Sequence, residues 1–185
     1  MYKSLRTSLA LLAAGSILSL ASVITAQTPA PSPALSGTWR LQGSVEDART
    51  QIQAAVNPAV APLTPDIQRM ARARISESTG IPTQIVIEAT ADRLRVQVSG
   101  DEEHVFEGAP GASQNVYSRS GVRAQLTQTY RPDGGIEQRF RAMDGTQWNF
   151  YSPQSDGRTM FLDVLMRSQR LAGDIRFRLV YTRAG

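Results

Sequence analysis

Gly37-Thr38-Trp39-Arg40-Leu41-Gln42-Gly43 decides the fold, together with Tyr181-Thr182-Arg183 near the other end of the chain. The first stretch predicts a β-strand, Thr38 to Gly43, that points Trp39 and Leu41 to one side. Trp39 and Arg183 both have inward parity, so we expect the guanidinium to stack on the indole where the two strands meet. This pairing predicts that the chain returns to its starting point and closes an antiparallel barrel.

Two helices are predicted after the first strand. Ser44 and Asp47 form a capping-box pattern, and Pro58 is expected to stop the first helix. Its apolar positions recur at helical spacing: Val45, Ala48, Ile52 and Val56. The second helix is predicted to begin with Thr64 as cap and Pro65 in its first turn. Its expected apolar stripe comprises Ile67, Met70, Ala71 and Ile75.

From Thr83 onward, apolar and polar residues alternate with a period of two, and turn signals such as Arg131-Pro132-Asp133-Gly134-Gly135 and Asp144-Gly145 separate the segments. This pattern predicts a mainly β fold: a closed up-and-down barrel of about 8–10 strands with a two-helix insertion after the first strand. The outward positions carry many arginines, among them Arg95, Arg123, Arg139, Arg141, Arg176 and Arg178. A lipid-facing band would not tolerate these charges, which excludes a membrane-spanning barrel.

Gly37-Thr38-Trp39 resembles the Gly-x-Trp start of the calycin superfamily, which includes the lipocalins and the intracellular fatty-acid-binding proteins. The likeness is greatest to the fatty-acid-binding group, in which two short helices after the first strand cap a ten-stranded barrel. In that group an Arg-x-Tyr pair on the last strand holds the ligand carboxylate. The matching spacing here is Leu179-Val180-Tyr181, so only the tyrosine fits. The resemblance therefore implies a lipocalin-like barrel that binds a small ligand without that carboxylate clamp.

The predicted interior is apolar and aromatic with a few polar groups, as in small-ligand sites. The expected ligand-binding residues are Tyr181, Tyr130, Gln128, Trp148 and Phe140, while Trp39 and Arg183 are expected to be structural. Phe150 is expected to face inward as well. Because Arg183 is the one inward arginine, a neutral or weakly polar amphiphile is favoured over a free fatty acid. The same side chains could instead fill a narrow barrel as core, and the sequence leaves both possibilities open.

No catalytic, metal or cofactor site is predicted. His104, the single histidine, stands among Asp101, Glu102, Glu103 and Glu107, a pattern more typical of a charged hairpin tip than of a zinc site. A Ser-His-Asp triad has no nucleophile elbow to support it, and no phosphate-binding loop is present. Asp163 is expected to be an ion-paired surface group.

The N-terminus predicts a secretory signal at 1–26, a Pro-rich linker at 27–35 and a single barrel domain at 36–185. Lys3 and Arg6 precede an apolar run, and cleavage is expected near Ala26, giving a periplasmic or secreted protein. Removing both cations lowers Lys plus Arg from 20 to 18, against 16 acidic residues. The mature charge is then too small to favour nucleic-acid binding. The chain has no cysteine, so packing without disulfides must hold the fold.

The sequence thus predicts an exported, non-catalytic barrel that binds a small apolar or amphiphilic ligand, with no integral membrane span after processing. The alternative is a filled barrel that serves as a structural or protein-interaction module of the bacterial cell envelope, with a protein partner there.

Overall fold

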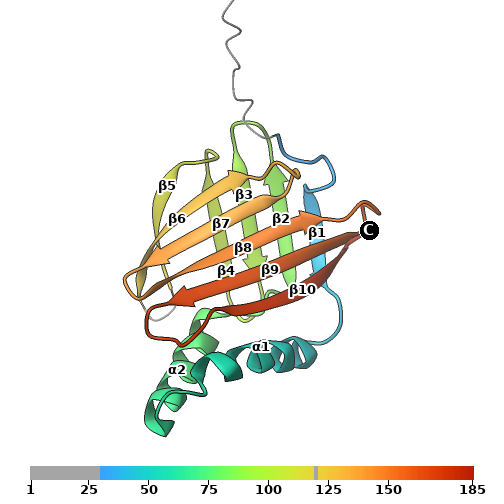
Figure 1. Cartoon of the computed structure of the whole chain (residues 1–185). Helices are drawn as coiled ribbons and strands as arrows, with labels where there is room; N and C mark the ends of the chain where they lie inside the picture. The colour runs from blue at the N-terminus through green and yellow to red at the C-terminus, as the bar shows by residue number, and fades with distance from the viewer. Residues whose placement is uncertain (1–29, 119–120) are drawn as a thin grey trace, which may run out of the picture.

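The structure is a computed structural model that describes residues 30–118 and 121–185. The predicted signal segment and residues 27–29 of the predicted linker lie outside this range. Along the described chain the elements are β1 (Gly37–Leu41), α1 (Val45–Val60), α2 (Pro65–Ser78), β2 (Gln84–Ala89), β3 (Leu94–Ser99), β4 (Glu103–Gly108), β5 (Ser113–Tyr117), β6 (Arg123–Tyr130), β7 (Ile136–Ala142), β8 (Gly145–Pro153), β9 (Thr159–Ser168) and β10 (Ile175–Arg183). One curled sheet stands above the two helices (Figure 1).

The ten strands form one antiparallel sheet in the order β4-β3-β2-β1-β10-β9-β8-β7-β6-β5. The predicted up-and-down order and two-helix insertion are confirmed, but the predicted closure is wrong. In the described chain β4 and β5 are the two edges of the sheet and do not pair with each other. In the loop between them, the N–H of Gly111 donates to the carbonyl of Gln128 at 2.7 Å, so the chain already contacts β6 before β5 begins.

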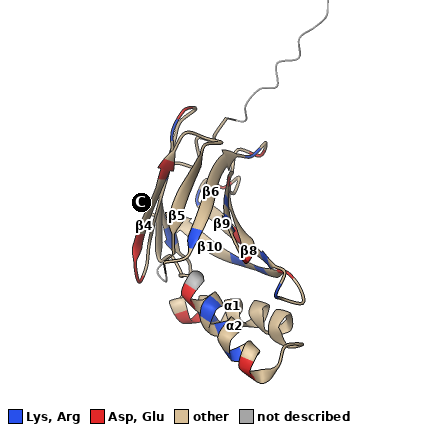
Figure 2. Ribbon diagram, turned by 90° about the vertical axis from the view of Figure 1, so that its left-hand side faces the viewer, with Lys and Arg blue, Asp and Glu red and all other residues tan. Residues whose placement is uncertain are grey.

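Where β4 and β5 leave the sheet open, side-chain contacts across the interior join its two facing halves, which Figure 2 shows from the side. The Tyr130 hydroxyl on β6 donates to the carbonyl of Thr90, beyond β2, at 2.6 Å. Phe106 on β4 and Phe140 on β7 meet edge to face, with ring centroids 5.4 Å apart. The molecule is therefore a partly open barrel whose halves touch across its interior.

The core forms where inward positions of successive strands face one another. The predicted alternation is confirmed on β2, β3, β9 and β10, whose fully or nearly fully buried residues include Ile87, Val96, Leu162 and Leu179. Each such aliphatic side chain contributes about 1.5–3 kcal/mol on burial. The core extends to Ile52 and Val56 of α1, so this helix packs onto the end of the barrel.

The prediction that Trp148 and Phe150 face the interior is wrong, because both lie on the outer face of β8. The inward residues of this strand are Gln147, Asn149 and Tyr151, which stand opposite Phe140, Gln138 and Ile136 of β7. Ala142 pairs with Gly145, so the hairpin turns at Met143-Asp144, one residue earlier than predicted. A slip of one residue moves every side chain of a strand to the other face.

Helix α1 begins as predicted, with the Ser44 side chain accepting from the N–H of Asp47 at 3.1 Å in a complete capping box. The expected stop at Pro58 is wrong, because the helix continues to Val60. Pro58 removes one backbone donor close to the C-terminal end, and the N–H of Ala61 still donates to Asn57 at 3.0 Å.

Helix α2 begins at Pro65 after Thr64, as predicted, but its apolar stripe is only partly packed. Ile75 is buried, whereas Ile67 is 48% exposed and Met70 is 55% exposed. The C-terminal end of α2 approaches the barrel, where the Thr79 hydroxyl lies 3.8 Å from the sulfur of Met166. None of the helices in the described chain is long and apolar enough to cross a membrane.

The segment before β1 packs onto the barrel at the end opposite the helices. Leu35 is fully buried in the core, although the sequence placed it in the linker. The N–H of Ser32 donates to Gly134 at 3.0 Å, and the Ser36 hydroxyl accepts from the N–H of Ala89 at 3.1 Å. The packed domain therefore begins before Ser36.

The predicted contact between Trp39 and Arg183 is confirmed. The two residues are paired across β1 and β10, and the guanidinium carbon lies 4.4 Å from the centre of the indole. Arg183 also donates to the carbonyls of Ser36 at 2.9 Å and Gly157 at 3.0 Å, and to that of Ala34. Gly37 makes this arrangement possible, because its φ is +142° and a Cβ there would collide with the guanidinium.

Replacing Trp39 with Ala should lower the free energy of unfolding by about 3–5 kcal/mol, because it empties a fully buried position. Arg183→Gln should cost about 1–3 kcal/mol, because it removes the stacking and leaves carbonyls without their donor. Urea denaturation followed by circular dichroism measures both. Arg40→Gln is the control, because Arg40 lies next to Trp39 on the exposed side of β1. It should change the free energy of unfolding by less than about 0.5 kcal/mol. We call the Arg183 side chain, with the indole and the carbonyls that it contacts, the clasp. Equal effects of Arg183→Gln and Arg40→Gln would contradict a stabilising role of the clasp.

Candidate functional site

The candidate site is the inner face of the sheet at its helix end, which we call the mouth. Inward residues of β4 to β8 are only partly buried there, and so are Val98 of β3 and Met166 of β9 at the same end, whereas most inward residues farther into the barrel are buried. The mouth residues are His104, Phe106, Val116, Ala124, Phe140 and Gln147. The unpaired edges β4 and β5 supply three of them. The inner surface is therefore accessible to solvent at this end.

Aromatic and aliphatic groups form the apolar part of the mouth. The Phe106 ring lies edge to face with Phe140 and is stacked against His104, with centroids 6.2 Å apart. Val116 and Ala124 are paired neighbours on β5 and β6. Since inward positions are normally sealed in a packed core, this exposed apolar surface can receive an apolar group from outside.

A chain of polar side chains runs from the mouth into the core. The Gln147 amide donates to Asn149 at 2.9 Å. Deeper in the barrel, the Gln138 amide donates to Gln128 at 2.7 Å, and the Tyr151 hydroxyl donates to Gln138 at 2.8 Å. Burial raises the pKa of Tyr151 well above its ordinary value, so this phenol stays neutral and acts as a donor.

The predicted ligand-binding residues have different surroundings. Phe140 lies in the mouth, and Gln128 belongs to the buried polar chain. Tyr130 donates to Thr90, and Tyr181 donates to the carbonyl of Pro82 at 2.8 Å. Burial raises the pKa of both phenols, and the charge of Asp92 adds to the increase at Tyr130. Contact of these four residues with a ligand stays a prediction, whereas Trp148 points away from the interior.

Five residues of this site were not predicted from the sequence. Three of them, Gln147, Asn149 and Tyr151, were missed because the sequence pattern assigned the opposite face of β8 to the interior, although their pairing partners on β7 were correctly predicted to face inward. Counting opposite residues from a Met143-Asp144 turn would have recovered them. Phe106 and His104 share inward parity on β4, but that strand is too short for its pattern to be distinctive.

No inward side chain of the mouth carries a fixed charge. His104 lies 3.5 Å from Glu102 at the edge of the mouth. Within the described residues, no group of three or more His, Cys, Asp or Glu side chains is placed to hold a metal ion. Arg183, which has inward parity, belongs to the clasp at the opposite end. The mouth therefore offers amide hydrogen bonds and apolar contact.

A groove of about 500 Å³ lies between α1 and α2 at the same end of the molecule. Ile52 and Val56 of α1 face Ile75 of α2 across it, and Asp101 from the β3–β4 turn reaches its rim. None of the mouth residues lines this groove, so it is a separate feature of the same end of the molecule.

No family model and no curated protein sequence matches this chain. Solved structures do match. The REP1-NXSQ fatty acid transporter covers 83% of this chain and 98% of its own, with a TM-score of 0.52 and 13% sequence identity. A Schistosoma mansoni fatty-acid-binding protein in complex with arachidonic acid covers 83% and 98%, with a TM-score of 0.51 and 10% identity. A SAHS (abundant heat soluble) protein from Ramazzottius varieornatus covers 85% and 100%, with a TM-score of 0.56 and 11% identity.

The similarities extend over most of this chain and nearly all of each neighbour, at sequence identities of 13%, 10% and 11%. They agree with the element order that the Gly37-Thr38-Trp39 start predicted. The chain has a calycin-type fold.

Proposed function

We propose that this protein is an exported, non-catalytic barrel that binds a small neutral amphiphile at the mouth. The observation that carries the proposal is the accessible apolar surface on the inner side of β4 to β8, around Phe106 and Phe140. Burying such surface under an alkyl chain contributes a favourable binding free energy of roughly 25 cal/mol per Å², before the entropic cost of binding is subtracted.

The polar side chains of the interior determine which ligand head group can bind. Gln147 and Asn149 lie at the accessible end of the polar chain, and their amides can both donate and accept. A hydroxyl, ester or amide head can exchange hydrogen bonds with them. A carboxylate would lose its hydration without a cation to replace it, since Arg183 is held in the clasp.

The structural neighbours support this ligand class by their fold and by the names of two of them, a fatty acid transporter and a fatty-acid-binding protein. The proposal departs from those names in the head group, because Leu179 stands where an Arg-x-Tyr pair would require arginine.

Export rests on the sequence of residues 1–26, whose basic start, apolar run and small residues are typical of a secretory signal. The mature protein would then work in the periplasm or outside the cell. An interaction module with a filled interior is the competing function, and a failure to take up any ligand would favour it.

A neutral amphiphile should bind and a fatty acid should bind more weakly. We expect monolaurin to displace the neutral dye Nile red from the full mature protein at a concentration about tenfold below that needed for laurate, because the carboxylate stays uncompensated. Fluorescence titration measures both, and mass spectrometry of lipids extracted from natively purified protein identifies what the mouth holds.

Phe140→Ala should weaken Nile red binding by about fivefold, the loss expected for one large apolar contact. Trp148→Ala is the matched control, because it removes an aromatic residue from the outer face of β8. It should leave the affinity for the dye unchanged. Absence of dye uptake and of extractable lipid, or equal losses in the two variants, would refute binding at the mouth.

Processing can be tested separately from ligand binding. Intact-mass and N-terminal peptide analysis of the exported protein should find a chain beginning at Gln27 or shortly after it. A chain in the envelope fraction that still begins with Met1 would refute cleavage of a signal peptide.

A further inference from the structure

The outer face of β7 to β10 combines arginines with aromatic rings. We call it the arginine–aromatic face and define it by Arg139, Trp148, Phe150, Phe161, Arg167 and Arg178. All six have outward parity: Arg139 pairs with Trp148, Phe150 with Asp163, and Asp163 with Arg178. The rings are partly exposed, so apolar surface lies outside the barrel as well as inside it.

A guanidinium covers each of the three rings. The distance from the guanidinium carbon to the ring centre is 4.3 Å for Arg178 over Phe161, 5.3 Å for Arg131 over Phe150 and 5.8 Å for Arg167 over Trp148. Stacking fixes the planar cations on the sheet while leaving N–H groups along their edges. These three arginines already bind carboxylates of this chain, because Arg131 pairs with Asp133, Arg167 with Asp174 and Arg178 with Asp163.

A hollow of about 440 Å³ interrupts the face between Arg131 and Arg178. Phe150 and Phe161 line it, together with Ser152, Gln154 and the carboxylate of Asp163. It offers an apolar contact, and its two arginines are ion-paired with Asp133 and Asp163.

The charge on this face is not balanced. Arg139, Arg141, Arg167, Arg176 and Arg178 are matched by Glu137, Asp163 and Asp174, which leaves a surplus of two positive charges. Asp163 binds Arg178, and Asp174 binds both Arg167 and Arg176. Within the described chain, Arg139 and Arg141 have no ion pair. They are the cations available to a partner.

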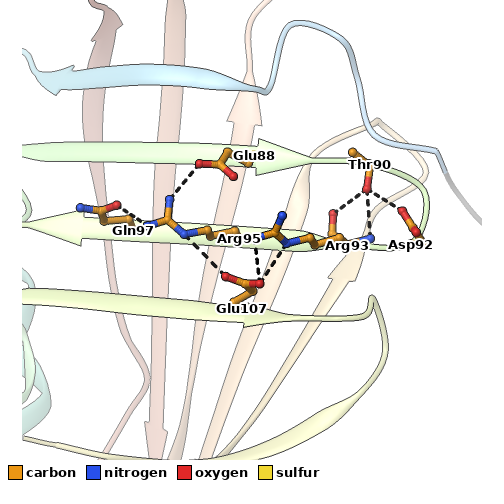
Figure 3. A network of polar contacts seen from close by, with 7 residues as sticks. All are labelled: Glu88, Thr90, Asp92, Arg93, Arg95, Gln97 and Glu107. Atoms are coloured by element: carbon orange, nitrogen blue, oxygen red, sulfur yellow. Dashed lines mark hydrogen bonds and ion pairs between the residues drawn. The ribbon is translucent and has the colours of Figure 1, made fainter.

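The outer face of β1 to β4 differs, because its charges neutralise one another. Arg95 lies 2.9 Å from Glu88 and 3.7 Å from Glu107, and Arg93 lies 2.9 Å from Glu107 (Figure 3). Arg40 and Glu103 complete a set of three arginines and three glutamates. The positive surplus is thus confined to one side of the barrel.

We infer that the arginine–aromatic face docks an acidic surface of another protein. Tryptophan, phenylalanine and arginine are the residues enriched at the centres of protein interfaces, and free cations favour a partner rich in carboxylates. Two positive faces of this chain would repel each other, which argues against a symmetric dimer. The rings lie under guanidinium groups and do not protrude, which argues against insertion into a bilayer.

The first test uses a short fluorescein-labelled peptide of alternating glutamate and leucine, titrated into the full mature protein. We expect saturable binding that salt weakens. Arg141→Gln should weaken it about threefold and Arg139→Gln/Arg141→Gln about tenfold. Arg40→Gln removes an exposed arginine from β1, beside the face rather than on it, and should weaken binding less than Arg141→Gln does. The peptide should also change the fluorescence of Trp148, one of two tryptophans, and Trp148→Phe should abolish that change while the buried Trp39 is retained.

Four results would overturn the inference: no saturable binding of the peptide, an equal effect of Arg40→Gln and Arg141→Gln, loss of fluorescence coupling to Trp148, or binding to phosphatidylglycerol vesicles in preference to the peptide. Sedimentation of the protein alone provides a fifth, because self-association weakened by Arg139→Gln/Arg141→Gln would make a second copy the partner. Circular dichroism and urea denaturation of each variant confirm that it is folded.

Discussion

The antiparallel ladder between β1 and β10, which we call the seam, holds the two parts of the sheet together. With β4 and β5 unpaired, this is the backbone ladder that joins the four-stranded and six-stranded parts of the sheet. It contains only three residue pairs, Trp39 with Arg183, Arg40 with Thr182, and Leu41 with Tyr181. Arg183 reinforces this short ladder by stacking on the indole and by binding carbonyls that come before β1 and after β8. The Gly37 backbone leaves the space that the guanidinium occupies.

Because the seam holds the sheet at one side, the opposite side can remain open. The edges β4 and β5 leave the inner face accessible near the helices, while Leu35 and Tyr130 close the other end. Strand β8 is unusual within this plan, with amides and a phenol inside and Trp148 and Phe150 outside. That inversion gives the interior its polar chain and the exterior its apolar rings, so one strand contributes to both candidate binding surfaces.

Two features were predictable because a short-range signal determines them: the Ser44–Asp47 capping box and the alternation of β2, β3, β9 and β10. The contact between Arg183 and Trp39 is long-range, and strand parity together with the expected strand order predicted it. Closure was not predictable, because it depends on whether the two edge strands β4 and β5 meet, which no local pattern shows. The orientation of β8 was predicted wrongly for a different reason. The hydrophobicity of Trp148 suggested that it faces inward, but the turn lies one residue earlier than predicted, and this register places Trp148 on the outer face. Ile67 and Met70 form an apolar stripe in the sequence, but no sequence signal shows how much of it the barrel covers.

The reach of the clasp along the chain also determines when the protein can fold. The hydrogen bond from Arg183 to Ser36 joins residues 147 positions apart. The seam cannot form until Arg183 is available, although the β2–β3–β4 and β6–β7–β8–β9 meanders can form by local pairing. Assembly is therefore expected to be late and governed by a contact of very high sequence separation, which makes folding slow compared with that of helical domains of similar size. A polypeptide that is still being synthesised before residue 183 would therefore lack its completed seam.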